Sequence, residues 1–213
     1  MKINKVPFEY QSEPLDKIDL NSPYGKLPYI HDSDNNTKVG DTNLIIPYLT
    51  KKFNVAIDAD MGSAERSIAI AFDRLIGEHL YWSGVIQPRW REDQGFETYI
   101  PHIVQGAEVT PELRAALDAF RKRIRDEFNG QGMGRRDGDC VVQFYQADID
   151  ALGDYLGQKK YFMGDRVRGI DAAVYAILRQ LVDQPMSWKG TGYIESKPNL
   201  VEYMARMRKE YNM

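Results

Sequence analysis

The sequence of 213 residues predicts an α+β fold that is mostly α, with a small strand-containing module over residues 1–56 and an all-helical domain over residues 63–213. Two observations support this prediction. In the first module, short apolar runs are interrupted by Pro, Ser, Asn and Gly, a pattern typical of strands and turns. From Ser63 onward, apolar residues recur every three or four positions, which is the spacing of one helix face. A joint between the two parts is expected over residues 56–62.

The first module is expected to contain two strand-like runs, VPFEY at residues 6–10 and LPYI at residues 27–30. The second run begins a hairpin whose other arm is residues 38–39, because the intervening DSDNN is rich in turn formers. Pro28 stands at the start of the first arm, where a proline removes no hydrogen bond from the ladder.

A helix is expected directly after the hairpin, with Thr42 as its N-cap. Pro47 is expected to interrupt or kink this helix early, because proline removes a main-chain donor. The apolar positions of the helix are Leu44, Ile45, Tyr48 and Leu49.

Two pairs of residues in this module suggest a binding site for a small peptide. A cis bond between Leu27 and Pro28 would turn the main-chain N–H and C=O of Leu27 outward, where an extended peptide can pair with them. The helix start at Thr42 would attract a carboxylate, and Asp41 beside it could hold an ammonium group. A peptide with a free amino-acid end satisfies all these groups, although each pair could equally serve only the local fold.

The helical domain is expected to contain five helices, over residues 63–86, 110–128, 139–156, 170–182 and 198–207. Ser63 and Thr110 are the expected N-caps of the first two, with Pro111 at the first helical position of the second. The second helix is expected to stop at Asn129, and Gly157 follows the third. The fourth is apolar nearly all round, which indicates a buried place at the centre of the bundle.

Two segments, residues 87–109 and 129–139, break this regular pattern and are expected to be loops or irregular helical extensions. Arg135 and Arg136 in the second segment suit either an anion site or a solvated basic loop.

The composition excludes several function classes. Lys and Arg number 28 against 31 Asp and Glu, so the net charge of -3 offers no broad field for nucleic acid or an anionic membrane. The sequence shows no apolar run of membrane-spanning length, so we expect no membrane insertion. The single cysteine, Cys140, forms no internal disulfide and suits a reducing, cytoplasmic location. Because His31, His79 and His102 show no ligand spacing, no metal site is expected.

The segments KLPYI (26–30) and GDT (40–42) resemble those of the glutathione S-transferase superfamily, whose first domain is thioredoxin-like and whose second is all-helical. This resemblance implies that Leu27 pairs with the cysteinyl backbone of glutathione and that Pro28 is a cis proline. It also implies that Asp41 and Thr42 hold the γ-glutamyl group. Further along, FMGDRVRGIDAAVYAIL is similar to the stretch before and along the family's buried central helix.

Within the superfamily, EHLYW, RW and GMGR look most like the branch of failed axon connections and metaxin proteins. Compared with the family, the first module lacks the first strand and most of the first helix of a thioredoxin-like domain. We therefore assign no residue that activates the glutathione thiol. The family's inter-domain cleft for a second substrate would be lined by Tyr81, Trp82, Arg89 and Trp90, although aromatic residues on a helix are often core.

Three readings of the function follow. The chain could bind glutathione or a similar thiol peptide and conjugate it to a small apolar electrophile. Alternatively, it could be a non-catalytic module of the same fold that binds a protein partner. In the third reading Met1 is an internal start, and the sequence is part of a longer, competent enzyme. A homodimer is expected in addition, because an incomplete first module gains from a second copy.

Overall fold

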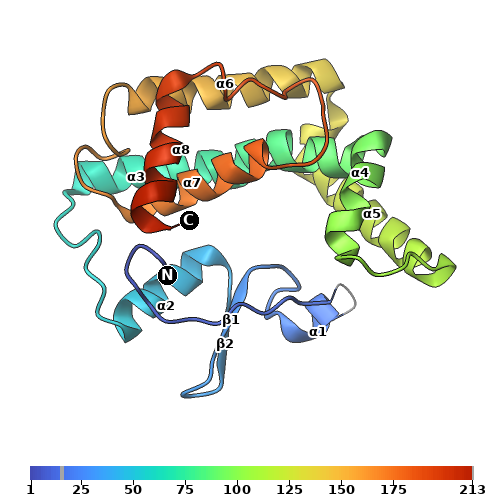
Figure 1. Ribbon diagram of the computed structural model, residues 1–213, viewed down its shortest axis with the longest axis horizontal. Helices are drawn as coiled ribbons and strands as arrows, with labels where there is room; N and C mark the ends of the chain where they lie inside the picture. The colour runs from blue at the N-terminus through green and yellow to red at the C-terminus, as the bar shows by residue number, and fades with distance from the viewer. Residues whose placement is uncertain (15–16, 213) are drawn as a thin grey trace. The chain divides into compact units, whose positions relative to one another are not determined.

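The computed structural model describes residues 1–14 and 17–212. It divides the chain into two compact units, Met1–Asp60 and Met61–Met213 (Figure 1). The fold is mostly helical, with one small sheet in the first unit, as the sequence predicts.

The first unit is built around an antiparallel hairpin. Its elements are α1 (Ile18–Asn21), β1 (Tyr29–Asp32), β2 (Thr37–Gly40) and α2 (Thr42–Lys52). Tyr29 lies opposite Gly40 and Asp32 opposite Thr37, so the predicted hairpin is confirmed. Among the described residues, β1 and β2 are the strands of this sheet. The predicted strand at residues 6–10 is wrong, because this run pairs with no other strand and has no regular structure.

Helix α2 differs from the prediction at its start. Asp41 is the N-cap, and its side chain accepts a hydrogen bond of 2.8 Å from the Asn43 N–H. Thr42 is therefore the first helical residue and not the cap. Pro47 lies within the helix and does not end it before Lys52.

A polar cluster fastens the hairpin to α2. The Asp32 carboxylate accepts hydrogen bonds from the Lys52 ammonium, at 2.5 Å, and from the Tyr48 hydroxyl. These bonds hold the pKa of Asp32 down to about 2, chiefly through Lys52 and then Tyr48. The bend of the hairpin and the helix are thereby held in one arrangement.

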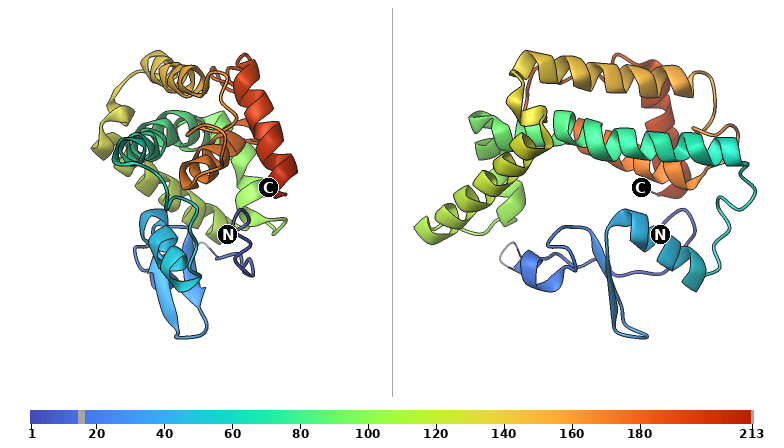
Figure 2. Two further views of the ribbon diagram at one scale, coloured as in Figure 1. Left: turned by 90° about the vertical axis from the view of Figure 1, so that its left-hand side faces the viewer. Right: turned by 180° about the vertical axis from the view of Figure 1, so that it is seen from behind.

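The second unit is an all-helical bundle (Figures 1 and 2). Its elements are α3 (Ser63–Leu75), η2 (Ile76–Arg91), α4 (Asp93–Val104), α5 (Pro111–Gln131), η3 (Met133–Arg135), α6 (Gly138–Leu156), α7 (Gly169–Val182) and α8 (Pro198–Tyr211). Figure 2 shows α3 and η2 as one continuous rod with α6 alongside it, and α8 running across α6 and α7.

The centre of this bundle is η2, a π-helix that contacts α3, α4, α5, α6 and α7. Most of its second half is buried, including Gly84 and Pro88. Residues 87–109 were expected to form loops or irregular helical extensions, and the π-helix η2, which continues to Arg91, agrees with this expectation. The expectation is wrong for α4, a regular helix that follows almost at once. Pro88 and Gly95, which suggest breaks in the sequence, are accommodated within the two helices.

The other helices follow the predicted pattern, with small shifts at their ends. Helix α3 is capped by Gly62, so Ser63 is its first residue. Helix α5 continues to Gln131 because Gly132 supplies the left-handed conformation that ends it, with φ of 104°. Asp137 caps α6 through the Cys140 N–H.

Helix α7 is largely buried, as predicted. Its first turn depends on Asp171, whose side chain is fully buried. The Asp171 carboxylate accepts hydrogen bonds from the N–H groups of Phe162 (2.9 Å) and Arg168 (2.8 Å) and from the Tyr203 hydroxyl (3.2 Å). The Arg168 side chain does not cap the helix. Instead, the carboxylate of Asp171, three residues later, accepts the hydrogen bond of the Arg168 main-chain N–H at the N-cap position.

Candidate functional site

A hollow of about 220 Å³ lies in the first unit where the hairpin meets the start of α2. Its lining residues are Tyr24, Lys26, Leu27, Pro28, Asp41 and Thr42. The four residues that the sequence singled out for peptide binding are therefore brought together. The hairpin register explains this, because Tyr29 pairs with Gly40 and the next residues outward are Pro28 and Asp41.

One wall of the hollow is the Leu27–Pro28 segment. The peptide bond between these residues is cis. Leu27 is 53% exposed, and neither its main-chain N–H nor its C=O has a hydrogen-bond partner among the described residues. The preceding loop is held by the buried Ser22, whose hydroxyl donates to the Lys26 carbonyl at 2.5 Å. A fixed wall with an unused main-chain donor and acceptor suits an extended peptide.

The opposite wall is the beginning of α2. Asp41 has φ of 67°, a left-handed value that costs on the order of 1–3 kcal/mol for a residue with a side chain and is common at ligand sites. One of its carboxylate oxygens caps Asn43. The hydroxyl and the main-chain N–H of the exposed Thr42 have no partner among the described residues. This wall therefore presents a negative carboxylate beside neutral donors at a helix N-terminus, which suits the zwitterionic end of an amino acid.

Tyr24 and Lys26 complete the lining and were missed by the sequence analysis. Tyr24 is placed by Gly40, since a Cβ atom on Gly40 would lie 3.0 Å from the Tyr24 ring. Gly25 between them has φ of 62°, which favours glycine. The signal in the sequence was the stretch SPYGK directly before Leu27, a turn that brings a phenol and an ammonium to the same edge.

The four residues expected at a second-substrate site all lie on η2 in the helical unit. Trp82 is half-buried, and its ring stacks on Phe128 with centroids 6.0 Å apart. Trp90 is buried and packs against Phe96, Tyr99 and Phe120. Both tryptophans therefore take part in the packing of the bundle.

Arg89 and Tyr81 have a more polar environment. The guanidinium of Arg89 donates to the Gln180 carbonyl at 3.0 Å and lies 4.9 Å from the centroid of the Tyr99 ring. Burial lowers the pKa of Arg89 and raises the pKa of the Tyr81 phenol. For both groups, burial therefore disfavours the charged form.

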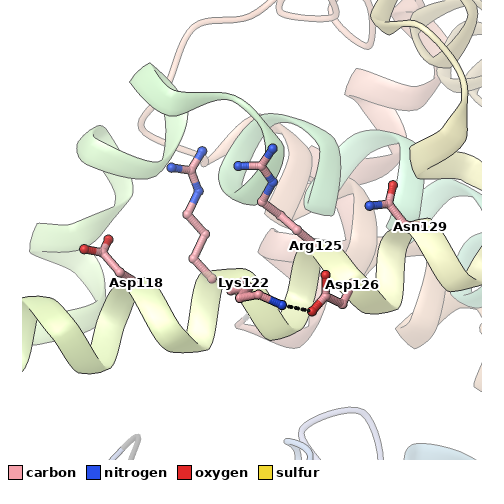
Figure 3. Close-up of a pocket in the computed structure, with 6 residues that line it drawn as sticks. Asp118, Lys122, Arg125, Asp126 and Asn129 are labelled. Atoms are coloured by element: carbon pink, nitrogen blue, oxygen red, sulfur yellow. Dashed lines mark hydrogen bonds and ion pairs between the residues drawn. The ribbon is translucent and has the colours of Figure 1, made fainter.

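A second hollow, of about 350 Å³, lies along α5 (Figure 3). Its lining carries both signs of charge, and the Lys122 ammonium pairs with Asp126 at 2.6 Å. Arg125 extends from the same helix face. The lining residues are Asp118, Arg121, Lys122, Arg125, Asp126 and Asn129. This hollow lies on a solvated helix face.

The remaining candidate groups are placed within the local fold. The guanidinium groups of Arg135 and Arg136 donate to the carbonyls of Asn129 and Gly132. The Nδ1 atom of His79 lies 2.7 Å from the Asp148 carboxylate, and burial raises the pKa of Asp148.

Within residues 1–14 and 17–212, no group of three His, Cys, Asp or Glu side chains could hold a metal ion. Over the same residues, no helix has the length and apolar character needed to cross a membrane.

Comparison with known protein families gives two matches. The model of the glutathione S-transferase N-terminal domain matches residues 1–95, and that of the C-terminal domain matches residues 145–207. No solved structure matches the chain.

Curated relatives agree with these matches. The chain is 58% identical over 208 residues to the isoprene-epoxide–glutathione S-transferase of Rhodococcus sp. (strain AD45), an alignment that covers 98% of this chain and 87% of the relative. It is 26% identical to failed axon connections of Drosophila melanogaster, over 90% of this chain and 48% of that protein. It is also 26% identical to a metaxin-1 homolog of Caenorhabditis briggsae, over 89% of this chain and 60% of that protein. The chain therefore belongs to the glutathione S-transferase family, with weaker similarity to its metaxin-like branch.

Proposed function

We propose that this protein is a glutathione transferase that joins the thiol of glutathione to a small apolar epoxide. The observation that carries the proposal is the 58% identity, over nearly the whole chain, to a transferase named for isoprene epoxide and glutathione. Similarity to failed axon connections and metaxin is much lower, so we rank a non-catalytic, partner-binding role second.

In this proposal, glutathione occupies the hollow of the first unit. Its cysteinyl backbone pairs with the N–H and C=O of Leu27 and crosses Pro28. Asp41 holds the γ-glutamyl ammonium group by a charge-assisted hydrogen bond, and Thr42 donates to the neighbouring carboxylate. Lys26 also lines this hollow, and its positive charge favours binding of the second carboxylate of glutathione. The shape of the hollow and the order of the charged groups around it support this orientation of glutathione.

The electrophile is proposed to meet the residues of η2, namely Tyr81, Trp82, Arg89 and Trp90. The aromatic rings supply apolar surface, and Arg89 supplies a buried cation.

We also propose module boundaries at residues 1–56 and 63–213, a homodimer and a cytoplasmic location. The single cysteine and the absence of a disulfide favour the cytoplasmic location.

A conjugation assay tests the proposed function. The purified protein is incubated with glutathione and the monoepoxide of isoprene, and the thioether adduct is quantified by mass spectrometry against a protein-free blank. We expect adduct formation that is proportional to protein concentration and saturates in both substrates. Glutathione binding without any adduct above the blank, under conditions where the protein is folded, would favour the partner-binding alternative.

A further inference from the structure

The hollow along α5 is lined by two rows of side chains, and within each row the residues follow one another at a spacing of one helical turn. One row alternates in charge and consists of Asp118, Lys122 and Asp126. The other row has two cations and an amide, and it consists of Arg121, Arg125 and Asn129. Like charges one turn apart destabilise a helix, so the neighbouring Arg121 and Arg125 call for an explanation.

Both carboxylates of the lining already have a cation as partner. Asp118 accepts two hydrogen bonds of 3.1 Å from the Nε atom of Arg114, and Asp126 pairs with Lys122 at 2.6 Å. Figure 3 shows the Arg125 side chain extending away from the Lys122–Asp126 pair. Over residues 1–14 and 17–212, no hydrogen bond or ion pair joins Arg125 to another residue. Its guanidinium is therefore free to bind an anion.

Arg121 is held in a fixed position at the edge of this hollow. Its side chain is only 12% exposed, and its guanidinium lies 4.6 Å from the centroid of the Phe96 ring. The Nε atom donates to the Trp90 carbonyl at 2.8 Å. The Nη2 atom donates to the Arg91 carbonyl at 3.0 Å and to the Asp93 carboxylate at 2.7 Å. The Nη1 atom has no partner in the described part of the chain, so one donor group of a fixed cation stays unused.

Arg125 and Asn129 add further donors beside this cation. The pKa of Asp93 is lowered by its hydrogen bond to Arg121 and, to a smaller extent, by the charge of Arg125, so both guanidinium groups act on the same region. Asp93 itself is 89% exposed and does not line the hollow, so solvent screens its competition for an added anion. The side-chain amide of Asn129 donates to none of the described residues.

We propose that the hollow along α5 binds a small phosphate monoester through Arg121, Arg125 and Asn129. A phosphate group has nearly two negative charges at neutral pH and three strong acceptor oxygens, which match the three sets of donors in this row. Guanidinium groups bind such oxygens with charge-assisted hydrogen bonds, often two in parallel. The volume of about 350 Å³ leaves room for the organic part of the molecule. This inference does not depend on the proposed glutathione site, which belongs to the first unit.

A titration followed by nuclear magnetic resonance tests this site in the full chain. Glycerol 3-phosphate is added to the ¹⁵N-labelled protein at constant ionic strength, with sodium chloride as the balancing salt, because salt screens exposed charges. We expect saturable shifts of the amide signals of α5 and of the Arg121 Nε–H signal. Saturation should occur at millimolar concentrations, since exposed ion pairs are individually weak. Acetate, with one charge and two oxygens, should bind at least fivefold more weakly.

Two variants and one control show which groups bind the phosphate. Arg125→Gln should weaken binding about tenfold, and it should leave the fold intact because the Arg125 side chain is exposed and unpaired. Arg125→Lys keeps the charge but loses the planar fork, so we expect a loss of about threefold. Lys209→Gln removes one positive charge from an exposed position of α8 and should change the affinity less than twofold.

The outcomes separate a specific site from a general effect of charge. Shifts that are confined to α5 and weakened only by the Arg125 variants would support the site. No saturable shift in the wild-type protein, or equal weakening in Arg125→Gln and Lys209→Gln, would overturn it. Equal affinity for acetate and glycerol 3-phosphate would overturn the assignment to phosphate.

Discussion

The close packing of η2 leads to a prediction about two of its glycines. A Cβ atom on Gly84 would lie 2.6 Å from the Leu181 side chain and 3.0 Å from the Tyr145 ring. On Gly77, in the same π-helix, a Cβ atom would meet nothing within 4 Å. Neither glycine has a positive φ, so the two positions differ mainly in the space around them.

The magnitudes follow from these contacts. Overpacking a core costs about 1–3 kcal/mol, whereas replacing Gly by Ala inside a helix gains about 1 kcal/mol. Gly84→Ala should therefore lower the free energy of unfolding by about 1 kcal/mol, while Gly77→Ala should raise it by up to about 1 kcal/mol. Gly95→Ala should be worse than both, since its Cβ atom would lie 1.7 Å from the main-chain oxygen of Pro88.

Urea unfolding followed by circular dichroism measures these differences under identical conditions. The three variants should rank Gly77→Ala above the wild type, then Gly84→Ala, then Gly95→Ala. If Gly84→Ala is as stable as Gly77→Ala, then η2 does not pack against α6 and α7 as closely as described, and the reasoning fails.

Two other predictions concern carboxylates of the fold. Asp32 has a pKa lowered to about 2, so its ion pair with Lys52 stabilises the folded state above the unfolded pKa of about 3.9 and is lost as the pH falls from about 4 towards 2. Asp32→Asn should flatten this part of the curve of unfolding free energy against pH, and an unchanged slope would argue against the cluster. Asp171→Ala should cost about 3 kcal/mol or more in chemical denaturation, because it leaves buried donors unpaired. The control Asp183→Ala removes an exposed pair with Arg179 and should cost less than about 1 kcal/mol; similar losses for both would contradict the account.

The parts of the fold that the sequence predicts are those set by local chemistry. The hairpin follows from turn formers between two short arms, and α5 follows from Thr110 and Pro111 at its start. The run VPFEY has strand composition but lacks a paired neighbour, and a strand depends on its partner. The N-cap of α2 is Asp41 and not Thr42, so the helix starts one residue earlier than predicted. A shift of this size is within the usual uncertainty of helix ends.

The π-helix could not be predicted from apolar spacing. Its hydrogen bonds are set by how η2 packs against five other helices, and Pro88 suggests a break. The environment of Arg89 could not be predicted either, because its hydrogen-bond partner Gln180 is far away in the sequence. The hollow of the first unit was accessible to sequence reasoning, because the hairpin register alone brings Pro28 next to Asp41.

The most direct test of the account is calorimetric titration of glutathione into the wild-type protein, Asp41→Asn and Asp41→Ala. Asn keeps a cap acceptor for Asn43 and tolerates positive φ, but it removes the charge proposed to hold the γ-glutamyl ammonium group. Both variants should bind glutathione about 10- to 100-fold more weakly, the range expected for a hydrogen bond between charged groups. Only Asp41→Ala should also lose about 1 kcal/mol of stability as its cap is removed.

We predict saturable heat for the wild-type protein and a large loss of affinity in Asp41→Asn with its melting temperature unchanged. Wild-type affinity in Asp41→Asn, or no saturable heat in the wild-type protein, would contradict the claim that the hollow between Leu27 and Thr42 binds glutathione.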